Sequence, residues 1–72
     1  MDVSNESLGE ALPKVMAYIR DTVIPAYESI GPTSIFAVSM MKLDLDLAAR
    51  SMAEEDLVGM IKAYKSLTEY KL

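Results

Sequence analysis

Two groups of carboxylates are the side chains of this sequence best suited to chemistry. Asp44 and Asp46 alternate with leucines, and Glu54, Glu55 and Asp56 form a continuous run. A hydrolytic pair of carboxylates must face one substrate from two sides, whereas residues two apart on a helix diverge by about 200°. The acidic run also lacks the glycine-containing loop of a calcium-binding hand. Both groups are therefore interpreted as solvated helix edges and helix-start charges, and no catalytic or metal-binding residue is predicted.

The residue types that most enzymes depend on are missing, because the sequence contains neither His nor Cys. Imidazole-activated nucleophiles, thiol chemistry and ordinary zinc or redox-metal sites are excluded on this ground. The sequence therefore predicts a protein that is not an enzyme and carries no cofactor.

Tyrosines offer the alternative reading of a small-molecule carrier. Tyr18, Tyr27 and Tyr64 could orient an apolar ligand in a cavity between helices or subunits. Tyr27 and Tyr64 also lie on or beside apolar helix stripes, where simple core packing explains them equally well.

Composition limits the classes of partner. A net charge of −4 and a pI near 4.5 argue against a protein that binds nucleic acid or an anionic membrane. A helix-turn-helix reading is the weakest alternative, since its recognition helix would present Glu54, Glu55 and Asp56 to DNA. The uncharged run 29–41 is too short to span a bilayer, and the N-terminal residues do not resemble a secretory signal. We expect a cytoplasmic protein.

Helical periodicity covers most of the 72 residues, which we interpret as one all-α domain, 1–72, of three helices. The predicted helices span 13–30, 34–50 and 52–70, after a polar N-terminal segment, 1–11, that is expected to be disordered. Pro13 fits the first turn of a helix. Pro25 predicts a kink or break near 22–25, and Gly31 followed by Pro32 predicts a firm stop.

The boundaries of the second helix are less well determined by the pattern. Residues 34–41 are almost continuously apolar, which suits a strand or a buried helix, and we favour helix because no partner strand can be found. Ser51 and Glu54 have the spacing of a capping box that would start the third helix. One continuous helix from Ser34 to about Tyr70 is the alternative.

The second helix has apolar residues on two sides. Phe36, Met40, Leu43 and Leu47 share one face, and Leu45 points the other way. A helix that is apolar all round is buried, and a three-helix chain offers few neighbours, so one face is predicted to meet a second subunit. The predicted interface residues lie around Leu45: Val38, Met41, Leu45, Ala48 and Met52. The alternative is that Leu45 packs against the first or third helix.

The functional expectation follows from these points. Half of the residues (51%) are hydrophobic in a chain too small to bury them all, and six are methionine, a residue that adapts to partner shapes as well as filling cores. We expect a non-enzymatic interaction module, such as a regulator, antagonist or adaptor, that forms a helical homodimer and binds another protein. The apolar-ligand carrier is the main alternative.

Overall fold

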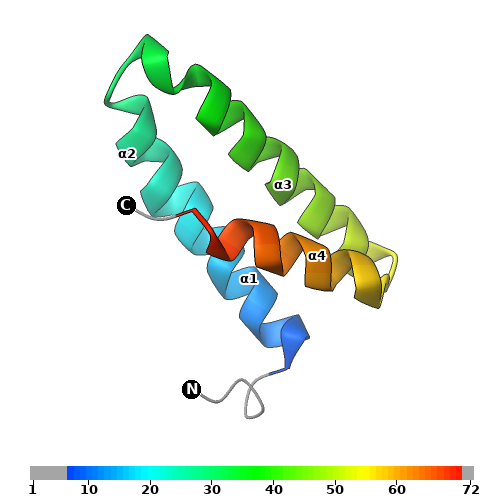
Figure 1. The fold of residues 1–72 in the computed structure, drawn as a ribbon. Helices are drawn as coiled ribbons and strands as arrows, with labels where there is room; N and C mark the ends of the chain where they lie inside the picture. Colours follow the sequence, from blue (N-terminus) through cyan, green and yellow to red (C-terminus); the bar gives the residue numbers. More distant parts are fainter. Residues whose placement is uncertain (1–6, 71–72) are drawn as a thin grey trace.

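Two long helical segments form a hairpin, and a shorter helix lies against both of them (Figure 1). The structure, a computed structural model, describes residues 7–70, and in these residues there is no β-strand. The elements in chain order are α1 (Leu8–Tyr18), η2 (Ile19–Val23), α2 (Ile24–Glu28), η3 (Pro32–Ser34), α3 (Ile35–Ala53) and α4 (Leu57–Thr68). The predicted all-α fold is confirmed. The segment 1–6, within the stretch predicted to be disordered, lies outside the described residues.

The first segment begins earlier than the sequence pattern predicted. Helix α1 starts at Leu8, so that Pro13 lies inside the helix and not in its first turn. Ser7 is the N-cap, and its carbonyl accepts hydrogen bonds from the N–H groups of Glu10 and Ala11. The missing donor of Pro13 costs one helical hydrogen bond. The extension nevertheless buries Ala11 and Leu12 in the core, which offsets this loss.

The predicted irregularity before Pro25 is present as a π-helical turn. Residues Ile19–Val23 form η2, which connects α1 to α2 without a break in the helical path. Because Pro25 has no N–H, the carbonyl of Asp21 loses its usual helical partner. The π turn lies directly before this proline, and both features are known causes of helix irregularity. Ile19 and Val23, at the two ends of η2, both remain buried.

The stop at Gly31 and Pro32 is confirmed and makes the hairpin. Gly31 has φ of 107°, a conformation that other residues rarely adopt. Pro32 then opens the short 3₁₀ turn η3, whose last residue, Ser34, donates a hydrogen bond from its hydroxyl to the Gly31 carbonyl at 2.8 Å. Residues 35–41 continue as α3, so the helical interpretation of this apolar stretch is correct.

The turn between α3 and α4 lies further along the chain than predicted. Helix α3 continues to Ala53, and Glu55 adopts the left-handed conformation, with φ of 56°. The Asp56 N–H donates to the Ser51 carbonyl at 2.8 Å and the Glu55 N–H to the Met52 carbonyl at 3.2 Å, the pattern of a Schellman turn. The helices are therefore separate, as the main prediction had it.

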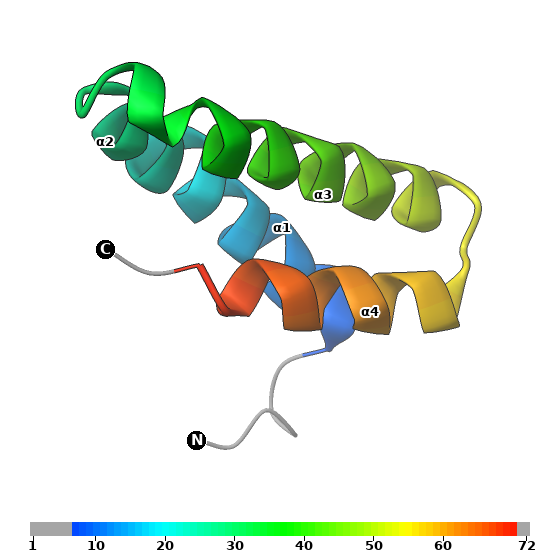
Figure 2. The same cartoon turned by 45° about the horizontal axis from the view of Figure 1, so that its top comes forward.

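Helix α4 is capped by Asp56 and not by the predicted Ser51. The Asp56 carboxylate accepts a hydrogen bond from the Gly59 N–H at 3.1 Å. Ser51 is instead buried inside the end of α3, beside Gly59, and a side chain at Gly59 would collide with the Ser51 hydroxyl and the Asp56 carboxylate. The turn thus reverses the chain, so that α4 runs back beside α3 (Figure 2), and the two helices approach closely at Gly59.

The core lies where α4 covers the hairpin, because α4 contacts both α1 and α3. Nine buried apolar residues form one cluster, to which every long element contributes. They are Leu12, Ile19, Val23, Ile24, Val38, Met41, Ala48, Ala63 and Leu67. Ala48 on α3 and Ala63 on α4 are both buried in this cluster, and α4 approaches α3 most closely at Gly59, beside Ser51.

Candidate functional site

The face of α3 that was predicted to be a subunit interface lies in the core of the single chain. Val38, Met41 and Ala48 are buried, and Leu45 and Met52 are half-buried against the same cluster. Buried side chains have no surface left for a partner in this arrangement. Leu45 packs against this cluster within the single chain, as the alternative prediction has it. A contact between α3 and a partner would then involve the opposite side of the helix.

That other side of α3 carries a row of four exposed apolar residues, hereafter the α3 row. Phe36 is 78% exposed, Met40 40%, Leu43 59% and Leu47 44%. They are four, three and four residues apart, the spacing that keeps a seam on one face of a helix. With a rise of 1.5 Å per residue, the row is roughly 16 Å long. These four residues share one face of α3, as predicted, but the predicted interface lies on the opposite side of the helix.

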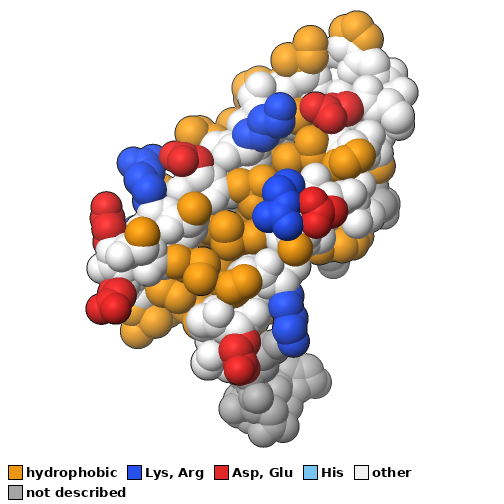
Figure 3. Space-filling model, turned by 180° about the vertical axis from the view of Figure 1, so that it is seen from behind, with side chains coloured by type: hydrophobic (Ala, Val, Ile, Leu, Met, Phe, Trp, Pro, Cys, Tyr) orange, Lys and Arg blue, Asp and Glu red, His pale blue; other side chains and the backbone are white. Residues whose placement is uncertain are grey.

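A second exposed apolar group, hereafter the α4 cluster, stands at the beginning of α4. Leu57, Val58 and Ile61 are each more than half exposed and lie within the first five residues of the helix. Lys62 and Lys65 are exposed on the same helix. Figure 3 shows one face of the molecule on which hydrophobic side chains reach the surface in the middle, with acidic and basic side chains distributed around them. Contiguous apolar surface of this kind marks interaction sites more often than chance exposure does.

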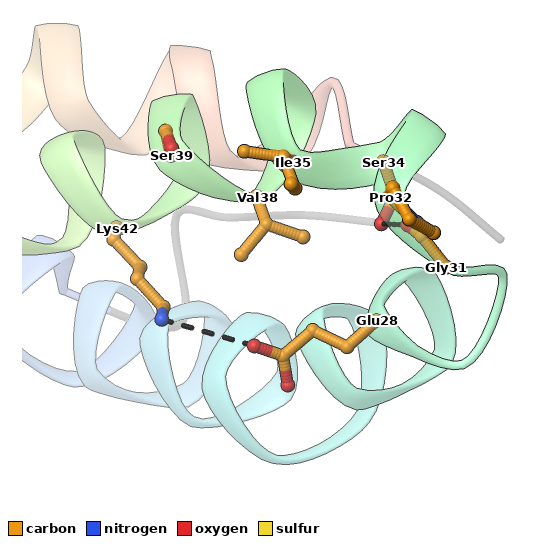
Figure 4. Close-up of a pocket in the computed structure, with 8 residues that line it drawn as sticks. All are labelled: Glu28, Gly31, Pro32, Ser34, Ile35, Val38, Ser39 and Lys42. Atoms are coloured by element: carbon orange, nitrogen blue, oxygen red, sulfur yellow. Dashed lines mark hydrogen bonds and ion pairs between the residues drawn. The ribbon is translucent and has the colours of Figure 1, made fainter.

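A pocket of about 430 Å³ lies beside the hairpin turn, between α2 and α3 (Figure 4). Ile35 and Val38 form its apolar wall, and Glu28 and Lys42 form an ion pair of 3.8 Å across it. Both charged side chains are more than half exposed, so this ion pair contributes little to stability. The pocket is an open recess whose lining combines these apolar side chains with two charged ones, whereas sites for small ligands usually enclose most of the ligand surface.

The three tyrosines of the carrier alternative do not meet at this pocket. Tyr27 and Tyr64 are half-buried against the core, and Tyr18 is exposed on α1. None of the three is among the lining residues of the pocket between α2 and α3. The structure therefore does not bring together the candidate ligand-orienting residues around this recess.

Asp44, Asp46 and Asp56 each have a partner within the chain. Asp46 forms a 2.9 Å ion pair with Arg50 one turn later, and Asp56 caps α4. Asp44 accepts a 2.7 Å hydrogen bond from the Tyr70 hydroxyl, a contact between residues far apart in the sequence. Asp44 and Asp46 thus have different neighbours, which agrees with their interpretation as separate helix edges.

Tyr70 is the one described residue whose titration is strongly shifted. Partial burial, followed by the hydrogen bond to Asp44 and the negative charges of Asp44 and Glu69, raises the pKa of Tyr70 from 10.0 to about 12. Each cause disfavours the charged phenolate. Tyr70 therefore acts as a neutral hydrogen-bond donor that ties the end of α4 to the middle of α3.

Comparison with known proteins returned no relatives: no protein-family model matches the chain, and no match was found among curated proteins or among solved structures. Within residues 7–70, no helix combines the length and the apolar character needed to cross a membrane. The same residues contain no group of three or more carboxylates placed to hold a metal ion. The exposed apolar helix faces are the surface features from which a function can be argued.

Proposed function

We propose that this protein is a non-enzymatic interaction module, in the manner of a small regulator, antagonist or adaptor, that assembles with itself and binds another protein through exposed apolar helix faces. The α3 row is the face that carries the proposal. Its residues are apolar, follow the spacing of a helix-packing seam, and lie in water in the isolated chain. Burial of such a row against another helix is favourable in proportion to the apolar area removed from water.

The existence of two separate apolar surfaces supports a module with two contacts. The α3 row lies on the long helix, and the α4 cluster lies after the turn that follows it. One surface can serve self-association while the other stays free for a different polypeptide. Exposed charges around the apolar surface, such as Asp46 and Lys62, give the polar rim that specific interfaces have.

Solution mass by light scattering, with circular dichroism on the same samples, tests this proposal. The test variant is Leu43→Glu, which places a charge in the middle of the α3 row. The matched control is Ala49→Glu, which adds the same charge at an exposed position of α3 outside the row. We expect an assembled wild type, an assembled Ala49→Glu variant and a helical, monomeric Leu43→Glu variant, because an unpaired charge buried in an apolar contact is strongly destabilising.

Two results would contradict the proposal. A wild type that stays monomeric at millimolar concentration would remove self-association from it. A wild type and a Leu43→Glu variant that assemble equally would show that the α3 row is not the contact. Loss of helicity in Leu43→Glu is not expected, because the side chain of Leu43 is mostly in water in the single chain.

A further inference from the structure

We infer that the occupant of the α3 row is the α3 row of a second copy of this chain, packed antiparallel. This inference rests on the proposed function and specifies the partner, the orientation and the register of the contact. The twofold axis passes between Met40 and Leu43, near the middle of the row. Each subunit then offers the same four residues, as a closed dimer requires.

The register follows from the spacing of the row. In this arrangement Phe36 lies opposite the partner's Leu47, and Met40 lies opposite the partner's Leu43. Phe36 is the most exposed member of the row, and Leu47, at the other end, is much less exposed. The antiparallel register therefore sets a protruding end against a recessed end in both halves of the contact. A parallel register would set the two protruding phenylalanines against each other.

Charge favours the same orientation. The next position of the seam after Leu47 is Arg50, which a parallel dimer would place opposite the partner's Arg50, with like charges adjoining. In the antiparallel register Arg50 lies opposite the partner's Thr33, at the exposed edge of the contact. Asp44 and Asp46 lie opposite the partner's Ala37 and the partner's Ser39, which are uncharged. No pair of like charges then faces across the seam, and like charges at such positions are destabilising.

The area of the row also fits a second copy. The exposed parts of its four side chains amount to roughly 400 Å² of apolar surface, which is the size of the largest apolar patch on a typical monomer, and such patches are often functional. Two rows and their flanking residues would bury on the order of 1,200 Å² in total, the lower end of the range for specific interfaces. Two copies of the chain therefore suffice to form an interface of this area, without a third polypeptide.

Disulfide trapping tests the orientation directly, because the chain has no cysteine of its own. Two variants, Phe36→Cys and Leu47→Cys, are mixed under reducing conditions, allowed to exchange subunits and then oxidised. Disulfides require Cα atoms less than about 7 Å apart, whereas residues 36 and 47 are about 16 Å apart along a helix. We expect the mixed 36–47 disulfide to exceed each symmetric disulfide about tenfold, since the antiparallel register brings only the mixed pair together.

A second pair of cysteine variants leaves the α3 row intact, so that the substitutions do not themselves weaken the contact. Ser39→Cys and Asp46→Cys replace exposed flanking residues, and the antiparallel register also predicts a mixed disulfide between them. Oxidation of each mixture in denaturant, which should give statistical products, is the control. Circular dichroism of each reduced variant establishes that it is folded.

The outcomes separate this inference from the proposed function. Mixed disulfides in both pairs support the antiparallel dimer. Symmetric 36–36 and 47–47 disulfides from a dimeric protein overturn the orientation and leave the proposed function standing. A dimer by light scattering that yields no disulfide in either pair places the contact elsewhere and overturns the inference. A wild-type monomer overturns both the inference and the self-association in the proposed function.

Discussion

The hydroxyl of Tyr70 donates a 2.7 Å hydrogen bond to the carboxylate of Asp44, and this bond joins the end of α4 to the middle of α3. Both side chains are partly buried. The bond closes the loop of chain formed by the second half of α3, the Schellman turn and α4. It therefore helps to hold α4 along α3, where Ala63 and Leu67 complete the core.

Replacement of Tyr70 by Phe is expected to lower the free energy of unfolding by about 1–2 kcal/mol, because it removes a hydrogen bond to a charged acceptor and leaves Asp44 less well solvated. Urea denaturation of wild type and variant measures the difference. Tyr18→Phe is the matched control, since it removes the same hydroxyl from an exposed tyrosine of α1. Equal effects of the two substitutions would show that the Tyr70–Asp44 bond adds nothing to stability.

The raised pKa of Tyr70 predicts a loss of stability at high pH. The folded protein keeps the phenol proton up to about pH 12, whereas an ordinary tyrosine releases it near pH 10.0. Between these values the folded state binds more protons than the unfolded state, so the contribution is fully present below pH 10 and is lost as the pH rises toward 12. The stability difference between wild type and Tyr70→Phe, followed by urea denaturation from pH 8 to 12, should decrease across this window. A difference independent of pH would contradict the assignment.

Gly59→Ala is expected to destabilise the protein by about 1 kcal/mol or more, although alanine is the better helix former. Its Cβ would meet the Ser51 hydroxyl and the Asp56 carboxylate, so the Asp56 cap or the close contact of α3 and α4 would have to give way. Gly9→Ala in α1 is the control, because its Cβ would make only an ordinary contact with Ser7. That substitution should raise stability by up to about 1 kcal/mol. Thermal unfolding of both variants checks the opposite signs.

Glu55→Gly is expected to stabilise the protein by about 1 kcal/mol. Glu55 holds a left-handed conformation with φ of 56°, which strains a residue with a Cβ but not glycine. The neighbouring Glu54→Gly substitution removes the same charge at an ordinary φ of −91°, where glycine only adds freedom to the unfolded chain. Urea denaturation should therefore give opposite signs for the two variants. A loss of stability in both would show that the Schellman turn is not strained at Glu55.

Local signals in the sequence predicted those features that depend on neighbouring residues. The stop at Gly31 and Pro32 and the irregularity before Pro25 follow from dihedral preferences and missing donors, and the structure confirms them. The lack of strands in residues 7–70 agrees with the prediction from helical periodicity and from the missing partner strand. The α3–α4 turn was placed too early because its left-handed residue is Glu55. A glycine there would have marked the turn, and Ser51 offered a false capping signal instead.

Features that depend on distant contacts were not predictable in the same way. The start of α1 at Leu8 depends on the burial of Ala11 and Leu12 by the rest of the chain. The Tyr70–Asp44 bond joins two helices with no shared sequence pattern. The two faces of α3 are similarly apolar, so periodicity identified both but could not decide which one meets the core. That choice depends on how α1 and α4 pack against α3, which is a long-range property of the fold.

Helix α3 is shared by two surfaces, since one face belongs to the core and the opposite face carries the α3 row. Substitution of most α3 residues is therefore constrained during evolution, either by their packing in the core or by their place in the α3 row. The residues expected to tolerate substitution lie in the narrow strips between the two faces, at positions such as Lys42, Asp46 and Ala49. Under the proposed function, a lineage that changed its partner would alter the α3 row and keep Met41 and Ala48, so a new binding specificity would not require a new fold.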